Sequence, residues 1–259
     1  GELRVAILSK IAMRIDDTRE EFAHSITMES GICIKQSRYE VQRAVTVFKA
    51  AAEVAKIIDT QDITSAYSCA DDKVKLKVLS EPLRLVVGIT PFNHPLNQVA
   101  HKVAPAIAAG TNIVIKPSEK TPLTALKLGE IICDIIPPGM VNIITGYPVQ
   151  EVVQKLVTYS GVELVTFTGG VDAGKSIIQM MDRNGKELTK KVMELGGSSP
   201  LYIADDADLD LAARIALNAF DNCGQRCTAT RRIFIDNKIA DAFIQKFSLR
   251  ASQLKYGDP

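Results

Sequence analysis

The spacing of apolar residues along the chain predicts helices and strands in alternation. Near the N-terminus Ile7, Ile11 and Ile15 recur at helical spacing, whereas residues 85–89 form a short apolar run. The predicted helices cover residues 5–28, 38–58, 121–136, 149–158, 172–181 and 239–254, and a further one begins at Asp208 with Leu211, Ile215 and Ala219 on its apolar face. The predicted strands cover residues 85–89, 112–116, 141–144, 163–167, 189–194, 200–204 and 231–235. This order predicts an α/β fold, with a Rossmann-like parallel sheet and helices on both of its faces.

One stretch of the chain has a different pattern. Between residues 70 and 80, Val74, Leu76 and Val78 alternate with lysines, as in a half-exposed strand. A strand with a lysine-rich face is often the edge of a sheet or a contact between subunits. We therefore expect a homo-oligomer, either a homodimer or a homotetramer.

Composition places the chain among soluble globular proteins. The 259 residues are 46% hydrophobic and 24% charged, and the net charge of +1 favours neither nucleic acid nor a membrane as a partner. No apolar run is long enough to span a bilayer, and the first residues do not resemble a signal peptide. The five cysteines are mostly scattered, which is typical of a reducing compartment, so we expect a cytoplasmic location. The three histidines form no cluster with metal-ligand spacing, so no metal site is predicted.

Candidate chemistry begins with the cysteine nearest the C-terminus. Cys227 stands between Arg226 and Thr228, and a fixed positive charge favours the thiolate, which is the nucleophilic form. Glu194, which lies upstream beside a pair of glycines, could serve as a base. Taken alone, these residues favour a structural interpretation over a catalytic one, in which Cys227 is a buried structural cysteine and Glu194 a surface residue.

A glycine-rich segment suggests nucleotide binding. Residues 169–176 read GGVDAGKS and follow a predicted strand, as the phosphate-binding loop of a nucleotide hydrolase does. In that interpretation Lys175 reaches the terminal phosphate, Ser176 binds Mg²⁺, and residues 201–205 form the second magnesium-binding strand. A glycine loop that opens a helix can also bind the pyrophosphate of a dinucleotide without any lysine. A plain strand-to-helix turn is the third interpretation, and the local sequence does not separate the three.

Five motifs in a fixed order give a more specific indication. They are PFNHP at residues 91–95, KPSE at 116–119, FTGG at 167–170, MELGG at 193–197 and GQRC at 224–227. In this order they resemble the aldehyde dehydrogenase superfamily over nearly the whole chain, whereas a phosphate-loop enzyme gives no role to PFNHP, KPSE or GQRC. Members of the superfamily are about twice as long, so the chain resembles a truncated member. The resemblance implies a dinucleotide-binding domain over residues 1–194, interrupted by the strand near 70–80, and the beginning of a second α/β catalytic domain over 195–259.

The resemblance implies catalytic roles for three residues. Cys227 is similar to the nucleophile that attacks the aldehyde and carries first a thiohemiacetal and then a thioester. Asn93 is similar to the donor that stabilises the oxyanion, and Glu194 to the base that activates water for release of the acid. Considered singly, Asn93 could instead cap the helix that follows Pro95. A non-catalytic protein on the same fold is also left open.

The resemblance further implies NAD as the cofactor, with NADP possible. Lys116 and Glu119 are similar to the residues that contact the adenosine ribose, where a carboxylate accepts from the 2′-hydroxyl and repels a 2′-phosphate. The same two residues could form a surface ion pair instead. The superfamily commonly has Ser at the position of Gly170. The implied cofactor-binding residues are Lys116, Pro117, Ser118, Glu119, Gly169, Gly170, Gly174 and Gly196.

The expected substrate is a small aldehyde that carries an anionic group. Arg226 and His94 adjoin the reactive residues, Arg43 lies on a helix that borders the substrate tunnel of the superfamily, and arginine binds phosphonate or carboxylate well. The segments FNHPLNQVAHK and GQRCTA are most similar to those of phosphonoacetaldehyde dehydrogenases, with lactaldehyde and succinate-semialdehyde dehydrogenases next. Alternatively, Arg226 only lowers the pKa of Cys227, and Arg43 is a solvated residue on the surface of its helix.

Overall fold

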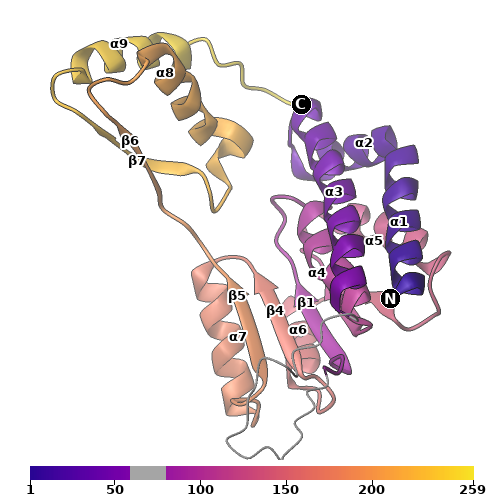
Figure 1. The fold of residues 1–259 in the computed structure, drawn as a ribbon. Coiled ribbons are helices and arrows are strands. Elements are labelled where there is room, and N and C mark those ends of the chain that lie inside the picture. The colour runs from indigo at the N-terminus through magenta and orange to yellow at the C-terminus, as the bar shows by residue number, and fades with distance from the viewer. Residues whose placement is uncertain (59–79) are drawn as a thin grey trace, which may run out of the picture.

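The computed structural model describes residues 1–58 and 80–259, and the lysine-alternating strand predicted between residues 70 and 80 lies outside that description. The centre of the fold is a five-stranded parallel sheet in the order β3-β2-β1-β4-β5 (Figure 1). Its strands are β1 (Leu85–Ile89), β2 (Asn112–Lys116), β3 (Val141–Ile143), β4 (Leu164–Thr168) and β5 (Lys190–Glu194). The predicted parallel sheet is confirmed.

Helices cover both faces of this sheet, because successive residues of a strand point to opposite sides. In β1, Val86 joins the core beneath the helices of one face and Val87 joins the core beneath those of the other. The first face carries α1 (Glu2–Asp17), α2 (Arg19–Ser30), α3 (Ile34–Ile58), α4 (Asn97–Ala109) and α5 (Leu123–Cys133), and the second carries α6 (Val149–Thr158) and α7 (Val171–Arg183). The prediction of helices on both faces is also confirmed.

The prediction of one helix over residues 5–28 is wrong, because the helix breaks at Thr18 into α1 and α2. Thr18 has φ −104° and ψ 24°, and its hydroxyl donates to the Arg14 carbonyl oxygen at 2.8 Å. Such a side-chain bond offers the backbone an alternative to continuing the helix. Glu20 and Glu21 then occupy the first turn of α2, where negative charge is favourable. The apolar spacing continues across the break and therefore does not reveal it.

A smaller unit follows β5. It contains the parallel strand pair β6 (Ser199–Ile203) and β7 (Thr230–Ile235), the helices α8 (Leu209–Leu217) and α9 (Ala240–Ala251), and the 3-10 segment η2 (Asn218–Gly224). The apolar face predicted for α8 is wrong: Leu211 and Ile215 are 44% and 43% exposed, whereas Ala213 and Ala216 are fully buried. Small side chains let α8 approach α9 closely, so the alanines face the core with Phe243.

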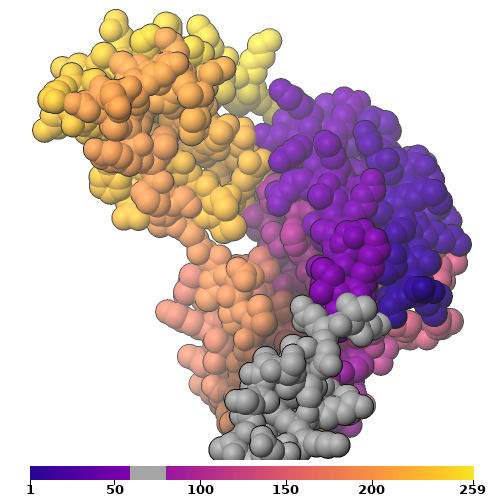
Figure 2. Space-filling model, in the orientation of Figure 1, coloured from indigo at the N-terminus to yellow at the C-terminus, as the bar shows by residue number. Residues whose placement is uncertain are grey.

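The smaller unit lies beyond the carboxyl ends of β4 and β5 (Figure 1). Its surface meets that of the helical layer in Figure 2, and the side chain of Arg226 donates to Gln36 of α3 across this boundary at 2.8 Å. A division into domains at residue 194 stays a prediction. Within the described part of the chain, no helix combines the length and apolarity that a membrane span requires.

Candidate active site

The carboxyl ends of the strands bring most of the predicted site residues to one edge of the sheet. Asn93 and His94 follow β1, residues 116–119 lie at the end of β2, Gly169 follows β4, and Glu194 ends β5. In a parallel sheet all carboxyl ends meet at the same edge, where ligands bind in open α/β folds. Motifs far apart in the chain are therefore neighbours here.

Cys227 lies outside the sheet, on the loop between η2 and β7, and close contacts fix this loop. Two non-glycine residues, Asn222 and Cys223, adopt positive φ (52° each), a strained conformation that needs support from its surroundings. The side chain of Arg231 provides part of it by donating to the Gly224 carbonyl oxygen at 2.7 Å. The loop also lies against the segment that follows β5.

That second contact depends on Gly197, the last glycine of MELGG. A Cβ on Gly197 would come 1.9 Å from the Cys227 carbonyl oxygen, far inside van der Waals contact. Only a residue without a side chain allows this approach. The glycine pair next to Glu194 is a sign of close backbone contact in the sequence, although Gly197 was not among the predicted site residues.

Asn93 connects the end of β1 to the cysteine loop. Its Nδ2 donates to the Gln225 carbonyl oxygen at 2.6 Å, and the Asn222 side chain donates to the Asn93 carbonyl oxygen at 2.9 Å. A side-chain amide nitrogen carries two N–H groups, so one remains for a substrate oxygen. Asn93 is thus held beside Cys227.

Glu40 of α3, rather than Asn93, caps α4. Its Oε1 accepts from the backbone N–H groups of Leu96 and Asn97 at 2.9 and 3.0 Å, and its Oε2 is 3.1 Å from Nδ1 of His94. The capping role considered for Asn93 is therefore wrong. Glu40 is 3% exposed, and its place on the apolar face of α3 was the signal that sequence reasoning missed.

Three cavities adjoin one another in series, and Cys227 lines two of them. The strand-end cavity, about 360 Å³, lies between the ends of β1, β2 and β4 and the helices α6 and α7. The cysteine cavity, about 320 Å³, shares Phe92 and residues 168–170 with it. The helix cavity, about 160 Å³, lies between α3, α4 and the cysteine loop, and it shares Asn93, Arg226 and Cys227 with the cysteine cavity. Cys227 therefore stands where the cysteine cavity and the helix cavity join.

The KPSE segment lines the strand-end cavity through Lys116, Ser118 and Glu119. Lys116 is 3% exposed, and its Nζ donates to the Pro117 carbonyl oxygen at 3.0 Å and to Glu119 Oε2 at 3.2 Å. The ion pair considered for these two residues is therefore present, with Lys116 buried and Glu119 exposed. A backbone N–H bond and the Lys116 ammonium hold the pKa of Glu119 below its usual range, so the carboxylate is charged at neutral pH.

The N-terminus of α7 faces the same cavity. Gly170 is its N-cap, no side chain caps it, and Gly169 and Gly170 line both the strand-end cavity and the cysteine cavity. Uncapped N–H groups at a helix start are suited to a phosphate. Gly174, another of the implied cofactor-binding residues, lies one turn inside the helix, where a Cβ would come 2.6 Å from Leu195 Cδ2. Gly196 lines the cysteine cavity.

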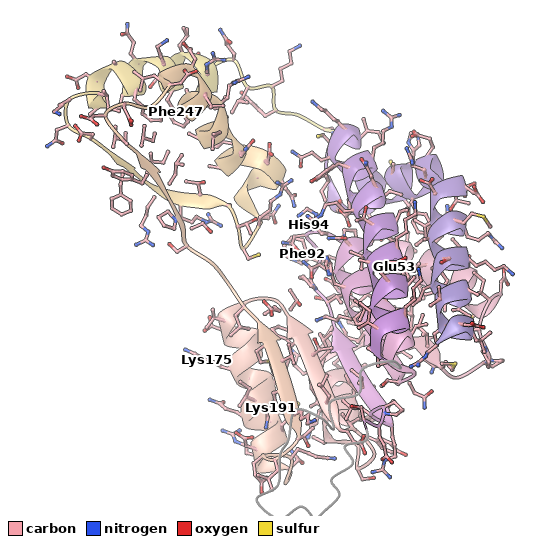
Figure 3. The ribbon with its side chains drawn as sticks, viewed as in Figure 1. Glu53, Phe92, His94, Lys175, Lys191 and Phe247 are labelled. Atoms are coloured by element: carbon pink, nitrogen blue, oxygen red, sulfur yellow. The ribbon has the colours of Figure 1, made fainter. Side chains whose placement is uncertain are left out.

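The phosphate-loop interpretation of residues 169–176 is wrong. A phosphate-binding loop needs open backbone between its first glycine and its lysine, but here the helix begins at Val171, four residues before Lys175. Lys175 is exposed and points away from the sheet (Figure 3). The segment considered as its magnesium-binding partner belongs to the other sheet, as part of β6.

Two of the three predicted substrate-binding cations already have partners. His94 is paired with Glu40, and Figure 3 shows it at the boundary between the helical layer and the smaller unit. Arg226 donates to Gln36 and lies 3.6 Å from the Asp221 carboxylate. Both side chains line the helix cavity, and each has a carboxylate beside it.

Arg43 is different. It lies on α3, is exposed, lines the helix cavity and makes no hydrogen bond or ion pair with any residue that the structure describes. His101 of α4 lines the same cavity, and the pKa of His101 is lowered by burial, then by Arg43 and Lys102. The uncompensated positive charge of the helix cavity is therefore at Arg43.

Glu194 lies apart from Cys227. It lines none of the three cavities, and no hydrogen bond between the two appears in the described structure. Its carboxylate instead acts on Lys102 of α4, whose Nζ donates to the hydroxyls of Thr166 and Thr168 at 2.9 and 3.0 Å. Burial lowers the pKa of Lys102 to about 8, and the attraction of Glu194 opposes this.

Sequence reasoning missed Lys102 as well. It is 7% exposed on a helix whose neighbouring buried positions include Val99 and Val103. A lysine in that apolar setting was the available signal. Across the described part of the chain, no group of three potential metal ligands occurs.

Comparison with known proteins agrees with this geometry. The profile of the aldehyde dehydrogenase family matches residues 1–259. The chain is 36% identical over 258 residues to a 3-sulfolactaldehyde dehydrogenase from Priestia aryabhattai, covering 99% of this chain and 53% of that protein. It is 37% identical over 264 residues to a lactaldehyde dehydrogenase from Methanococcus aeolicus, covering 99% and 54%.

Solved structures give the same result. A betaine aldehyde dehydrogenase from Staphylococcus aureus in complex with NAD⁺ superposes with a TM-score of 0.90 at 35% identity, covering 98% of this chain and 51% of that one. The chain thus spans about half the length of the curated relatives it matches. With five motifs in order, the parallel sheet that assembles them and a profile match from end to end, the chain belongs to the aldehyde dehydrogenase family.

Proposed function

We propose that this chain provides the cofactor site and the catalytic cysteine of an aldehyde dehydrogenase that oxidises a small anionic aldehyde with NAD. The observation that carries the proposal is the position of Cys227, at the junction of the cysteine cavity and the helix cavity. One side of the cysteine then opens toward α7, and the other toward Arg43.

Cys227 and Asn93 make the first bond. The Cys227 sulfur attacks the aldehyde carbon from the junction and forms a thiohemiacetal. The negative charge that develops on the aldehyde oxygen is stabilised by the second N–H of the Asn93 amide, because the first is bound to Gln225. That contact with Gln225 keeps the amide oriented.

Glu194 and Lys102 serve the second half of the reaction. NAD held at the strand-end cavity would supply the hydride acceptor, and loss of hydride from the thiohemiacetal carbon would leave a thioester on Cys227. The family resemblance assigns to Glu194 the removal of a proton from the water that attacks this thioester, and because its carboxylate lies outside the three cavities here, that role requires the side chain to turn toward Cys227. The positive charge of Lys102, whose pKa burial lowers to about 8, attracts the Glu194 carboxylate.

The residues fit NAD at the strand-end cavity. The uncapped start of α7 beyond Gly169 and Gly170 receives the pyrophosphate. Lys116 and Glu119 receive the adenosine ribose, and the charged Glu119 carboxylate favours a 2′-hydroxyl over a 2′-phosphate. NAD is therefore preferred to NADP.

Arg43 supports an anionic substrate. It is the cation of the helix cavity without a partner in the described structure, and a guanidinium binds carboxylate, sulfonate or phosphonate through two parallel hydrogen bonds. The similar proteins named for 3-sulfolactaldehyde and lactaldehyde also point to small polar aldehydes. Phosphonoacetaldehyde is one such small anionic aldehyde. His94 and Arg226 would be further contacts to its phosphonate.

The proposal extends to the assembly and domains of the whole protein. We expect a homodimer or homotetramer, a cofactor domain over residues 1–194 and a catalytic domain that begins at residue 195. Light scattering of the purified protein measures its mass in solution. A mass equal to that of the monomer alone would contradict the proposed oligomer.

A burst assay tests the chemistry. Protein is mixed with NAD or NADP and with phosphonoacetaldehyde, 3-sulfolactaldehyde, succinate semialdehyde, lactaldehyde or propanal, and absorbance of the reduced cofactor is followed. Cys227→Ala should abolish both burst and turnover, whereas Glu194→Gln should spare the burst and slow turnover. Cys133→Ala, which removes another exposed cysteine, is the matched control.

Two outcomes would contradict the proposal. No burst with any aldehyde would favour a non-catalytic protein on this fold. A preference for propanal that Arg43→Met leaves unchanged would contradict the proposal that the substrate is anionic. Lys49→Met, which removes another exposed cation from the same helix, is the control.

A further inference from the structure

The imidazole of His94 is held at one nitrogen only. Its Nδ1 is 3.1 Å from Oε2 of Glu40, a carboxylate that is 3% exposed, and its Nε2 has no hydrogen-bond partner among the described residues. An ionised carboxylate only accepts hydrogen bonds, so this pairing assigns the proton of the neutral imidazole to Nδ1. Nε2 therefore carries the lone pair and is the basic nitrogen of the ring.

The Glu40 carboxylate that holds His94 is itself fixed to the backbone. Its Oε1 accepts from the N–H groups of Leu96 and Asn97 at the start of α4. Negative charge at a helix start is favourable, so this position stabilises the ionised form of Glu40. Glu40 thus gives the imidazole a defined tautomer and orientation, as a carboxylate does for the base in a nucleophile–histidine–carboxylate arrangement.

The segment that carries His94 is bound directly to the cysteine loop. Asn93, the residue before His94, donates to the Gln225 carbonyl oxygen at 2.6 Å, and its own carbonyl oxygen accepts from the Asn222 side chain at 2.9 Å. Gln225 lies two residues before Cys227. His94 and Cys227 therefore lie on two segments that are joined beside them, and both residues line the helix cavity.

Helix α3 contacts both of these segments. Gln36 accepts a hydrogen bond from Arg226, the residue before Cys227, at 2.8 Å. Glu40 lies four residues after Gln36, so the two contacts are about 6 Å apart along the helix. The imidazole and the thiol make no hydrogen bond in the described structure, and contacts between a base and its nucleophile often tighten only when a substrate binds.

Two imidazoles line the helix cavity, and His94 is the better base. Burial, then the charges of Arg43 and Lys102, lowers the pKa of His101, so that ring resists taking a proton. His94 instead has the Glu40 carboxylate beside it, which stabilises an imidazolium. The other titratable or charged groups on the wall of this cavity are Tyr39, Arg226 and Cys227.

We propose that His94 is the base that takes the thiol proton of Cys227, and that Glu40 positions it. This inference rests on the proposed function. As the sulfur bonds to the aldehyde carbon, the S–H bond breaks, the proton moves to Nε2 of His94, and the carbonyl electron pair moves to the oxygen, where Asn93 stabilises it. When water hydrolyses the thioester, the imidazolium returns this proton to the departing sulfur. Glu194 is then needed only for the attack of water, which agrees with its position outside the three cavities.

Alkylation of Cys227 by iodoacetamide, without cofactor or aldehyde, tests the proton transfer by itself. Mass spectrometry of the peptide that contains Cys227 separates its reaction from that of the other exposed cysteines. An unassisted thiol ionises near pH 8.5, so only about 3% of it is thiolate at pH 7. The parent protein should therefore react about tenfold faster than His94→Gln at pH 7, and the two rates should converge at about pH 9.5, where both thiols are ionised.

Glu40→Gln distinguishes a base from a residue that only packs. Glutamine keeps an acceptor oxygen for the two N–H groups of α4, but its amide nitrogen donates to Nδ1 of His94, which moves the ring proton to Nε2. This variant should keep its cofactor affinity and its midpoint in urea unfolding, and should lose alkylation rate at pH 7 as His94→Gln does. Glu53→Gln and His24→Gln, which alter an exposed carboxylate and an exposed imidazole, are the matched controls.

The burst assay with NAD and an aldehyde supplies the second measurement. His94→Gln should slow the burst about tenfold or more at pH 7 and approach the parent rate at about pH 9.5. A burst slowed equally at both pH values would mean that His94 only contacts the substrate, and would overturn the proposal. Equal alkylation rates of the parent and either variant at pH 7 would do the same.

The two assays also separate this inference from the proposed function. A burst that neither variant changes refutes the role of His94 alone. Alkylation that depends on His94, in a protein that gives no burst with any aldehyde, refutes the dehydrogenase function and leaves the activated thiol in place.

Discussion

Replacement of Lys102 by methionine should stabilise the folded protein at neutral pH. The pKa of Lys102 falls from 10.5 to about 8 because burial disfavours its charged form. Keeping the group charged at pH 7 therefore costs about 3 kcal/mol, from a pKa difference of about 2.5 at about 1.4 kcal/mol for each pH unit. Loss of the hydrogen bonds to Thr166 and Thr168 offsets about 1–2 kcal/mol of this gain. The expected net stabilisation is about 1–2 kcal/mol.

The sign of the pH dependence follows from the same two pKa values. Between about pH 8 and 10.5 the unfolded chain holds a proton on Lys102 that the folded protein has released, so stability rises with pH in this range. The parent protein should gain up to about 3 kcal/mol relative to Lys102→Met between about pH 7 and about pH 10.

Urea unfolding at both pH values, with circular dichroism as the signal, measures this difference. Lys175→Met removes an exposed lysine and is the matched control, because its stability should track that of the parent at both pH values. A difference between parent and Lys102→Met that is the same at both pH values would refute the assignment of a depressed lysine pKa.

Three further substitutions test other contacts. Gly197→Ala should reduce the burst by about tenfold or more with little change in cofactor affinity, because its Cβ would displace the Cys227 loop; an unchanged burst would mean that the loop relaxes freely. Gly88→Ala should destabilise the protein by about 1–3 kcal/mol in urea unfolding, because its Cβ would come 2.5 Å from Ile115 Cδ1. Glu119→Gln should raise NADP affinity relative to NAD in a fluorescence titration. Since the pKa of Glu119 is lowered below its usual 4.5, the preference of the parent for NAD should be constant above that pH and weaken only as pH falls through the lowered value.

The alternating pattern of the chain was sufficient to predict the sheet and its layers. Short apolar runs such as residues 85–89 bury residues on both faces, and only a strand covered on both sides requires that. The break at Thr18 was not predictable in the same way, because it depends on a hydroxyl bond within an otherwise periodic segment. The face of α8 was misjudged because helix packing there selects Ala213 for its small size over the larger Leu211.

Some residues of the site could likewise be predicted from the sequence, and others could not. Motifs such as PFNHP and KPSE located Asn93 and Lys116, since strand ends gather these residues by topology alone. The partners of His94 were not predictable, because Glu40 meets it only through the packing of α3 on α4, from 54 positions away in the chain. Buried polar residues such as Glu40 and Lys102 escape a periodicity argument, which treats every charged position as outward-facing.

The helix cavity and the strand-end cavity draw their walls from different parts of the scaffold. The first depends on side chains of α3 and α4, whose backbones are anchored in the helical core, and the second on the edge of the sheet. Under the proposed function, point mutations on these two helices would change aldehyde preference without touching the walls of the cofactor cavity. A mutant library restricted to Arg43 and His101 would sample such changes in the laboratory.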